Sequence, residues 1–310
     1  MHMFTGFDNR FLAIGLALIG AVALAIGAQF QNDAVGEKQG KNQKPNGSLS
    51  IKQLLSLMKH PRWITGILLT GVAVVFQIAS LSLAPLIVVQ PLGAIALVVT
   101  SLLNARVSRT KLNRITMVAI ALCILGVGGF VAAASTVAKE TVLTDNSMLA
   151  VLAILTVILL IFVVVFARRG KTAKAIQFII GAGVLYGFVA TLTKMVIQRI
   201  YQGQFEWLTL ICLVMLGVTV AFGGWFVQSA YASGPPDLVI AGLTVIDPMV
   251  AVVIAATILG EAHLANPLTF LFFVICGSAA ILGVLLLSQF HPQVLLAKRK
   301  AALWSKRRRA

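Results

Sequence analysis

The sequence predicts an all-α polytopic membrane protein with nine transmembrane helices. Three observations lead to this fold class: an apolar composition, nine apolar runs of membrane-spanning length, and basic residues that gather on one side when nine helices alternate. Of the 310 residues, 59% are hydrophobic and only 11% are charged. A water-exposed surface could not be built from this composition. The three cysteines lie inside apolar runs, and we expect them to be small buried hydrophobes.

The nine helices are defined by apolar runs of about 20 residues, the length that crosses a hydrocarbon core of about 30 Å. The first run lacks a basic leader and a small-residue cleavage site, so we expect it to be retained and not removed as a signal peptide. The second and third runs are divided at Ala84-Pro85, because proline cannot continue the helical ladder and disfavours helix at the residue before it. The runs lie at 11–31, 63–84, 86–107, 115–135, 148–167, 178–200, 207–233, 239–261 and 269–290.

The basic residues set the expected orientation. Six lie between the first and second helices, four at 106–114, four at 168–174 and seven in the tail at 298–309, all on one side if nine helices alternate. The other four, Arg10, Lys139, Lys194 and Arg199, lie on or near the opposite side. By the positive-inside rule we expect the N-terminus outside and the C-terminus in the cytoplasm. Eight or ten helices would spoil this separation.

The charge pattern also bears on partners. The net charge of +16 sits in short clusters that act as orientation signals, so no nucleic-acid partner is expected. The polar segment 32–62 should have a mobile cytoplasmic loop at its middle. Expected partners are membrane lipids, which the basic tail could contact, and a small solute or ion. A homodimer is left open, and no cofactor is expected. The short chain with few acidic residues suits the cytoplasmic (inner) membrane of a bacterium.

An internal repeat relates the two halves of the chain. An offset of 151 residues pairs Gly66 with Gly217, Gln77 with Gln228, Pro85 with Pro236 and Gly126 with Gly277. Paired helices run in opposite directions, so the repeat is inverted, as in many secondary transporters. We therefore divide the chain 4+1+4, into a first repeat at 1–147, a linking fifth helix at 148–177, a second repeat at 178–290 and a basic cytoplasmic tail at 291–310.

The unusual residues of these helices resemble the drug/metabolite transporter superfamily, and most closely its NIPA-like magnesium transporter branch. The resemblance rests on Trp63 and Gly66, Ala84-Pro85, the run Val89-Gln90-Pro91-Leu92-Gly93-Ala94, Cys123-Ile124-Leu125-Gly126, "YGFVATLTK" at 186–194 and "FVQSAYASGPPDLVIAGL" at 226–243. It implies an EamA-like helical bundle that carries a solute.

One departure from that branch concerns the second helix. The resemblance implies Gly-Glu followed three residues later by Asn, where this chain has Ala73-Val74 and Gln77. The implied intramembrane carboxylate is therefore missing. Because a divalent ion favours several hard oxygen ligands, carboxylates foremost, this difference weakens the case for magnesium as the solute and leaves the kind of metal site unknown.

Asp247, in "LTVIDPMVAV", is the leading candidate for solute binding. Among the nine acidic residues it is the single one well inside a span. A charged side chain near mid-bilayer costs about 2.5–3.5 kcal/mol, so it normally faces protein or a watery pathway. Pro248 frees the carbonyl near position 244, which could join the carboxylate around a proton, a cation or an amine. The alternative is a structural role, as the cap of a kink or as a partner of Lys194.

Gln77, Gln90 and Gln228 are further candidates, because amides in the bilayer need partners and two of them occupy equivalent places in the two halves. They could hydrogen-bond a solute in a midplane cavity or simply join helices. Four prolines would break or hinge the helices around such a cavity, which is tolerable where the exposed backbone meets protein or water. They are Pro85, Pro91, Pro236 and Pro248.

Three more side chains complete the candidate solute site. Lys194 either binds the solute or extends to the membrane interface, and Tyr186 and Tyr231 either line a pocket or pack between helices. Glu261 and His263 form only a weak E-x-H metal pattern at a helix end. Glycines at 126, 128, 129, 223 and 224 favour close helix approach.

The sequence therefore predicts a carrier and not an enzyme. It contains no GxSxG, HExxH or Walker motif, so any driving force must be a gradient. We expect alternating access around a cavity lined by helices 1–3 and 6–8. The solute could be magnesium or another cation, an organic metabolite, or a polyprenyl-linked lipid moved between leaflets. A membrane scaffold that organises envelope enzymes without transport is the alternative from another class.

Overall fold

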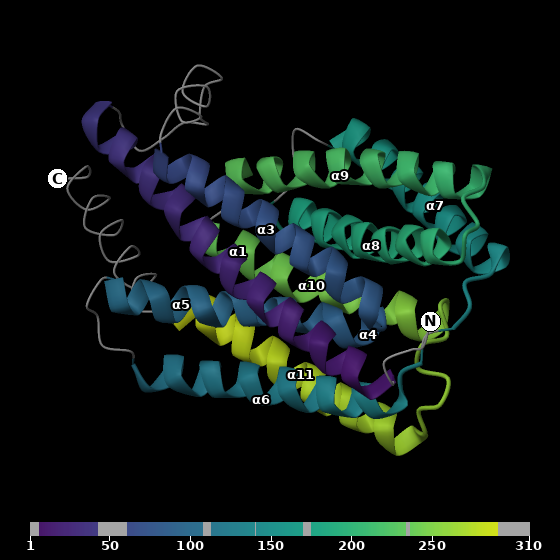
Figure 1. Ribbon diagram of the computed structural model, residues 1–310. Coiled ribbons are helices and arrows are strands. Elements are labelled where there is room, and N and C mark those ends of the chain that lie inside the picture. The colour runs from purple at the N-terminus through teal and green to yellow at the C-terminus, as the bar shows by residue number, and fades with distance from the viewer. Residues whose placement is uncertain are drawn as a thin grey trace.

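The computed structural model describes residues 6–42, 61–107, 113–139, 141–169, 175–233 and 236–290. Every regular element within these residues is a helix (Figure 1). The elements are α1 (Gly6–Asn42), α3 (Pro61–Leu83), α4 (Leu86–Val89), the 3₁₀ helix η1 (Gln90–Ala94), α5 (Ile95–Val107), α6 (Arg114–Val137), α7 (Asp145–Arg169), α8 (Ala175–Tyr201), α9 (Trp207–Ser233), α10 (Pro236–Thr257) and α11 (Pro267–Phe290).

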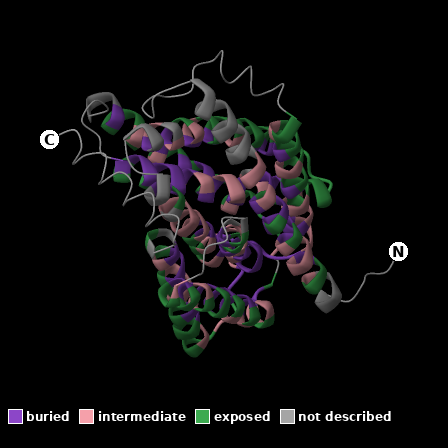
Figure 2. Cartoon of the chain, turned by 90° about the vertical axis from the view of Figure 1, so that its left-hand side faces the viewer, coloured by how far each residue is buried: buried purple, intermediate pink, exposed green. Residues whose placement is uncertain are grey.

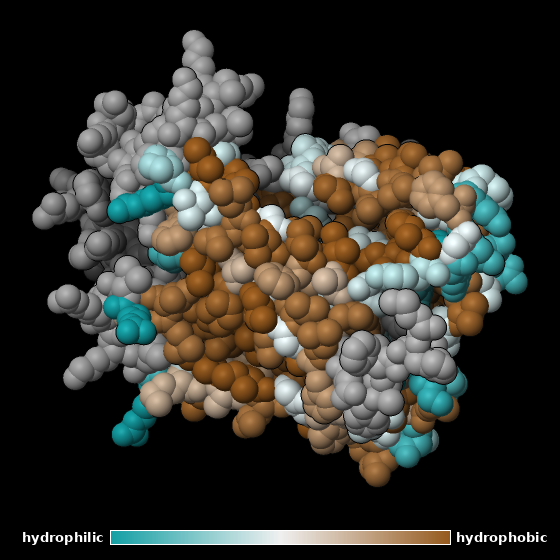
Figure 3. Space-filling model, viewed as in Figure 1, coloured by the Kyte–Doolittle hydropathy of each residue, from teal (hydrophilic) through white to brown (hydrophobic). Residues whose placement is uncertain are grey.

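The expected polytopic membrane fold of about nine helices is confirmed. Eight helical spans among the described residues are long and apolar enough to cross a membrane, and α10 contributes a shorter apolar helix at Gly242–Thr257. Large apolar side chains such as Leu125 and Val214 are 73% and 66% exposed, as expected where helices face lipid tails. On the face seen in Figure 3, hydrophobic residues cover the middle of the molecule and hydrophilic residues gather towards its two ends.

The first helix is longer than its apolar run. α1 continues to Asn42, through the beginning of the segment 32–62 that was expected to form a loop. Residues 32–42 contain no proline and include the good helix formers Ala34, Glu37 and Lys38, so the helix continues past the end of the apolar run despite Gly36 and Gly40. The middle of the expected loop, residues 43–60, lies outside the described residues.

The break at Ala84-Pro85 is present. α3 ends at Leu83, and Pro85 precedes the first turn of α4 with an extended backbone conformation. The third span is not one regular helix, because the 3₁₀ helix η1 interrupts it with Pro91 in its first turn. Proline removes a backbone donor and clashes with the preceding turn of an α-helix, and the tighter 3₁₀ turn accommodates it there.

The end of α10 differs from the expected span. The helix ends at Thr257, before position 261, and the chain turns through Gly260, which has a φ of +67°. Glycine adopts this left-handed conformation without the penalty that a Cβ brings. The turn directs Glu261 back into the bundle, where its side chain is 1% exposed.

Glycines set the closest helix contacts. α6 and α11 lie side by side (Figure 1), and a Cβ on Gly126 would lie 2.5 Å from the backbone nitrogen of Ala280. On the same interface, a Cβ on Gly283 would lie 2.6 Å from the backbone nitrogen of Cys123. These contacts require glycine, as in close helix pairs within membranes. Gly128 meets nothing within 4 Å, so the expectation of close approach fails there.

The helix pairs of one half recur in the other. α1 packs along α3 and α8 packs along α9, while α8 also packs on α10 and α1 on α5. The hairpin breaks fall at matching places, since α3 ends at Leu83 and α9 at Ser233. Buried residues line the inside of the resulting bundle and exposed residues its outer helix faces (Figure 2). The helix contacts are thus alike in the two halves, and the inverted orientation of the repeat stays a prediction.

Candidate functional site

A cavity of about 470 Å³ lies among α1, α3, η1, α5, α8 and α10, and we call it the central cavity. Each long helix contributes one face, at helical spacing. These faces are Ala17, Gly20, Ala21 and Leu24 on α1; Ala73, Val74, Gln77, Ile78 and Leu81 on α3; Tyr186, Val189, Ala190 and Thr193 on α8; and Leu243, Thr244, Asp247 and Pro248 on α10. The cavity thus lies near the middle of α8 and α10.

Two predicted amides meet in the central cavity. Gln77 on α3 donates from Nε2 to Oε1 of Gln90, at 3.4 Å. Gln90 starts η1 and is 8% exposed, so the helix break after Pro85 is what brings it opposite Gln77. Each amide in this long contact retains further donor and acceptor capacity, which a solute or its water shell can use.

Asp247 supplies the acidic group of the central cavity. Its Oδ1 is buried from solvent and has no hydrogen-bond partner among the described residues. An unpaired buried carboxylate oxygen carries a large desolvation cost. A cation, a proton or a polar solute in the cavity would remove that cost, and this makes Asp247 the strongest candidate contact.

The helix around Asp247 is weakened by the next residue. Pro248 lies inside α10 and has no N–H to donate to the carbonyl of Thr244. Thr244 lines the cavity, and its hydroxyl donates to the carbonyl of Ile240 in the turn before. Carboxylate, hydroxyl and backbone oxygens are therefore available on one stretch of α10.

α8 contributes one face to the central cavity, and the sequence predicted only part of that face. Tyr186 was a candidate and lines the cavity, but Thr193 was missed. Tyr186, Val189, Ala190 and Thr193 recur at the spacing of one helical face, and this pattern could have identified the threonine. The hydroxyl of Thr193 donates to the carbonyl of Val189 and keeps its lone pairs as acceptors.

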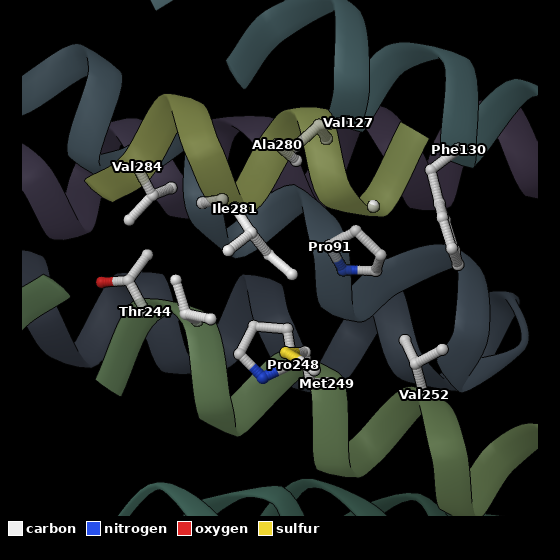
Figure 4. Close-up of a pocket in the computed structure, with 13 residues that line it drawn as sticks. Pro91, Val127, Phe130, Thr244, Pro248, Met249, Val252, Ala280, Ile281 and Val284 are labelled. Carbon is white, nitrogen blue, oxygen red and sulfur yellow. The ribbon is translucent and has the colours of Figure 1, made fainter. Parts of the chain in front are cut away.

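A smaller apolar pocket of about 100 Å³ adjoins the central cavity and shares Thr244 and Pro248 with it. In Figure 4, Pro91 on η1 and Pro248 on α10 lie on facing sides of this pocket, and Phe130 of α6 borders it. The proline-bearing segments of the two halves therefore meet at the centre of the bundle. The other two candidate hinges lie at helix starts, Pro85 before α4 and Pro236 at the first residue of α10.

Lys194 lies elsewhere than expected. Its side chain is 1% exposed, so it does not extend to the membrane interface, and it is not among the residues that line the central cavity. Its Nζ donates to the carbonyl oxygens of Leu81, at 2.6 Å, and Ala84, at 2.8 Å. α3 ends there, so its last carbonyls lack helical donors, and a cation at this end of a helix satisfies them.

Two candidates fall outside what the structure describes. Gln228 and Tyr231 lie on the last turns of α9, and their side chains are outside the described residues. Trp225, on the same helix, is 51% exposed and packs against Phe166, Phe178 and Phe226. It forms an aromatic cluster between α7, α8 and α9 and does not line the central cavity.

Glu261 has a structural contact that the weak E-x-H pattern did not indicate. Its two carboxylate oxygens accept hydrogen bonds from the backbone N–H groups of Leu86, at 3.0 Å, and Ile87, at 2.8 Å. It therefore caps the start of α4. His263 is exposed and contacts the carbonyl of Gly260, so the pair does not converge. Among the described residues, no group of three or more His, Cys, Asp or Glu side chains could hold a metal ion.

Comparison with known proteins identifies the family. The chain matches the family described as "Magnesium transporter NIPA" over residues 9–291. It belongs to that family. The NIPA match spans every helix of the described residues apart from the first residues of α1, so the central cavity lies wholly within it. Family membership makes this chain a membrane transport protein.

The curated relatives are distant in sequence. The chain is 25% identical to "Probable magnesium transporter NIPA9" of Arabidopsis thaliana over 86% of this chain and 81% of the relative. It is 24% identical to an uncharacterized protein of Corynebacterium glutamicum, over 82% and 86% of the two chains. A "Probable magnesium transporter" of Candida albicans is 27% identical over 36% and 30%. No solved structure matches the chain.

Proposed function

We propose that this protein is a secondary transporter that carries Mg²⁺ or a similar cation through the central cavity by alternating access. The observation that carries the proposal is the Oδ1 of Asp247, buried at the cavity without a partner among the described residues. The names of the Arabidopsis and Candida relatives supply the candidate ion.

The chemistry of the cavity fits an ion that keeps its water. Mg²⁺ loses water reluctantly and is usually held through one or two carboxylates while it retains several waters. With its octahedral water shell the ion occupies roughly 200 Å³, at about 30 Å³ per water, and the cavity has about 470 Å³. Asp247 would supply the negative charge, and Gln77, Gln90, Tyr186 and Thr193 would hydrogen-bond the water shell.

The missing carboxylate at Val74 agrees with this mode of binding. Val74 lines the central cavity but carries no charge. Asp247 is therefore the lining residue that supplies negative charge. One carboxylate with several neutral oxygen acceptors is too weak a set for a bare divalent ion, but it is sufficient for contact through water. The cation is therefore held weakly, as a carrier that must release its solute requires.

Alternating access would use the two halves of the molecule. The segments around Pro91 and Pro248 meet beside the cavity, and the hairpin breaks recur at matching places in both halves. Rocking of one half against the other would open the cavity to each side in turn. The sequence contains no nucleotide-binding motif, so an ion or solute gradient would drive the cycle.

Asp247→Asn tests the proposal. Removing the charge should lower Mg²⁺ uptake into proteoliposomes, followed with an enclosed magnesium indicator, by about tenfold or more, because a charged hydrogen-bonding partner contributes roughly 1.5–3 kcal/mol. Glu206→Gln, which removes an exposed carboxylate before α9, should leave uptake unchanged. Full Mg²⁺ uptake by a folded Asp247→Asn protein would exclude the proposed site.

An organic solute is the second candidate, because most residues that line the central cavity are apolar. Such a solute would place its apolar part against Leu24, Ile78 and Leu81 and a cationic or polar group at Asp247. Thermal-shift screening of the purified protein with divalent cations, amino acids and polyprenyl phosphates separates the two. Stabilisation by an organic compound and none by Mg²⁺ would favour the second candidate.

A further inference from the structure

A third cavity lies at the end of the bundle where α3 ends and α4 begins. It has a volume of about 300 Å³ and is lined mostly by polar side chains, among them Ser82, Thr141, Lys194 and Gln198. We call it the end pocket. It is too polar to be a lipid-facing groove, and the proposed cation site does not use it.

The end pocket and the central cavity lie along the same helix faces. On α8, Ala190 and Thr193 line the central cavity, and Lys194 and Ile197, four residues further on, line the end pocket. On α3, Ile78 lines the central cavity and Ser82 the end pocket in the same way. Residues four apart lie on one face of a helix, so one seam between α3 and α8 borders both compartments.

The seam is closed at the junction of the two compartments. Leu81 is 2% exposed and Lys194 is 1% exposed, and Leu81 and Thr193 are the last residues of α3 and α8 that line the central cavity. The ammonium of Lys194 bonds the carbonyls of Leu81 and Ala84 across this seam. One buried cation thus joins α8, in the second half, to the end of α3, in the first.

Glu261 holds the other side of the same break. While Lys194 bonds the end of α3, the carboxylate of Glu261 bonds the first N–H groups of α4. The turn that carries Glu261 is itself joined to the α6–α7 connection, because Lys139 donates its backbone N–H to the carbonyl of Glu261. Two buried charges of opposite sign therefore fix the break at Ala84-Pro85.

We propose that the solute passes between α3 and α8, from the central cavity to the end pocket, and that Lys194 latches this passage closed. The inference rests on the proposed transport function and adds the route and its gate. In the closed state Lys194 also places a fixed positive charge at the constriction, which repels a cation. Opening requires the carbonyls of Leu81 and Ala84 to separate from Nζ, so Lys194 is a positioning residue and not a solute ligand.

Cysteine labelling tests the latch without any transported solute. Ala190→Cys places a thiol in the central cavity, and a membrane-impermeant maleimide is applied from each side of reconstituted vesicles. Gln198→Cys identifies the side of the end pocket. When the maleimide is applied from the side of the end pocket, Ala190→Cys should react slowly in the protein that keeps Lys194. In the double variant with Lys194→Met it should react about tenfold faster or more, because two hydrogen bonds from a charged donor are lost. Lys194→Arg, which keeps the donors, should restore slow labelling.

Arg199→Met is the matched control. Arg199 is a buried cation on the same helix, but it bonds Asp145 and Gln204, away from the seam. The chain without added cysteines gives the background, since Cys123, Cys212 and Cys276 are buried. An unchanged labelling rate of Ala190→Cys in folded Lys194→Met, or an equal rise with Arg199→Met, would overturn the latch.

A second variant covers the case in which Lys194→Met does not fold. Ser82→Cys with Gln198→Cys places one thiol on each helix of the end pocket, and a reducible bifunctional thiol reagent joins them. Joining should stop Mg²⁺ flux, and reduction should restore it, while neither single variant responds. Flux through the joined protein would overturn the route. Absence of Mg²⁺ flux in the unsubstituted protein would count against the proposed function alone, because the labelling pattern needs no solute.

Discussion

At the scale of single residues, the central cavity is notable for how little charge it holds. Asp247 provides a carboxylate with a buried, unpartnered oxygen, and the amides of Gln77 and Gln90 contact each other at 3.4 Å. A second carboxylate would hold a divalent ion more tightly. The position that could supply it is Val74, which lines the cavity and is 52% exposed.

Val74→Glu should therefore raise the apparent affinity for Mg²⁺. A carboxylate within the cavity adds a favourable interaction with the ion of about 1 kcal/mol or more, which is about fivefold in apparent affinity. Concentration-dependent uptake into proteoliposomes measures the change. Val74→Gln, with the same size and no charge, is the matched control. An equal change in apparent Mg²⁺ affinity in both variants would show that a charge at this position does not affect binding of the ion.

At the scale of secondary-structure elements, two devices shape the bundle. The first is a buried charge at a helix break, where backbone N–H and C=O groups lack helical partners. Lys194 donates to a free carbonyl before Pro85, and Glu261 accepts from a free N–H group after it. Arg10 does the same for α6, because it bonds the carbonyls of Ser135 and Ala138 at the end of that helix. In a membrane such groups have no water to bond. Glycines form the second device, and they allow α6 and α11 to approach closely.

Gly126→Ala tests the glycine contact between α6 and α11. The added Cβ would lie 2.5 Å from a backbone nitrogen of α11, so the helices must separate and lose packing. We expect a loss of about 1–3 kcal/mol, typical of overpacked cores, seen as a lower midpoint of thermal unfolding in detergent. Gly128→Ala, on the same helix with open space around its Cβ position, should unfold as the unsubstituted protein does. Equal midpoints for the two variants would show that the contact does not limit stability.

At the scale of the whole molecule, the distribution of charge predicts the orientation in the membrane. The 21 basic residues of the loops and the tail would lie in the cytoplasm, and the break at Pro85 and the end pocket would face outside. The proposed latch would then close the outer side of the transporter.

Reporter fusions test this orientation. Green fluorescent protein attached after Ala310 should fluoresce, because the positive-inside rule predicts a cytoplasmic tail, and alkaline phosphatase at the same place should be inactive. The reverse pattern is expected for fusions after Val137, at the end of α6. An active phosphatase after Ala310 would invert the assignment and place the end pocket on the cytoplasmic side.

Much of the fold could be predicted from the sequence, because membrane helices are specified locally. The length and polarity of each run decide whether it can span a bilayer, and the ends of α3, α5 and α9 agree with the expected spans. The same local reasoning identified Asp247, Gln77 and Gln90, since polar residues within apolar runs stand out. Their placement around one cavity agrees with that reasoning, while their role in transport remains a prediction.

The sequence by itself determined that the chain forms about nine membrane helices, that it breaks at Ala84-Pro85, and that Asp247 lies inside a span. Only the tertiary structure decided the partners of the buried polar groups. Lys194 bonds a carbonyl 113 residues away and Glu261 an amide 175 residues away, and no local pattern links such positions. A buried charge bonds whichever unpaired polar group lies within about 3 Å. Helix packing decides which group that is, so the type of side chain alone could not distinguish a latch from a ligand.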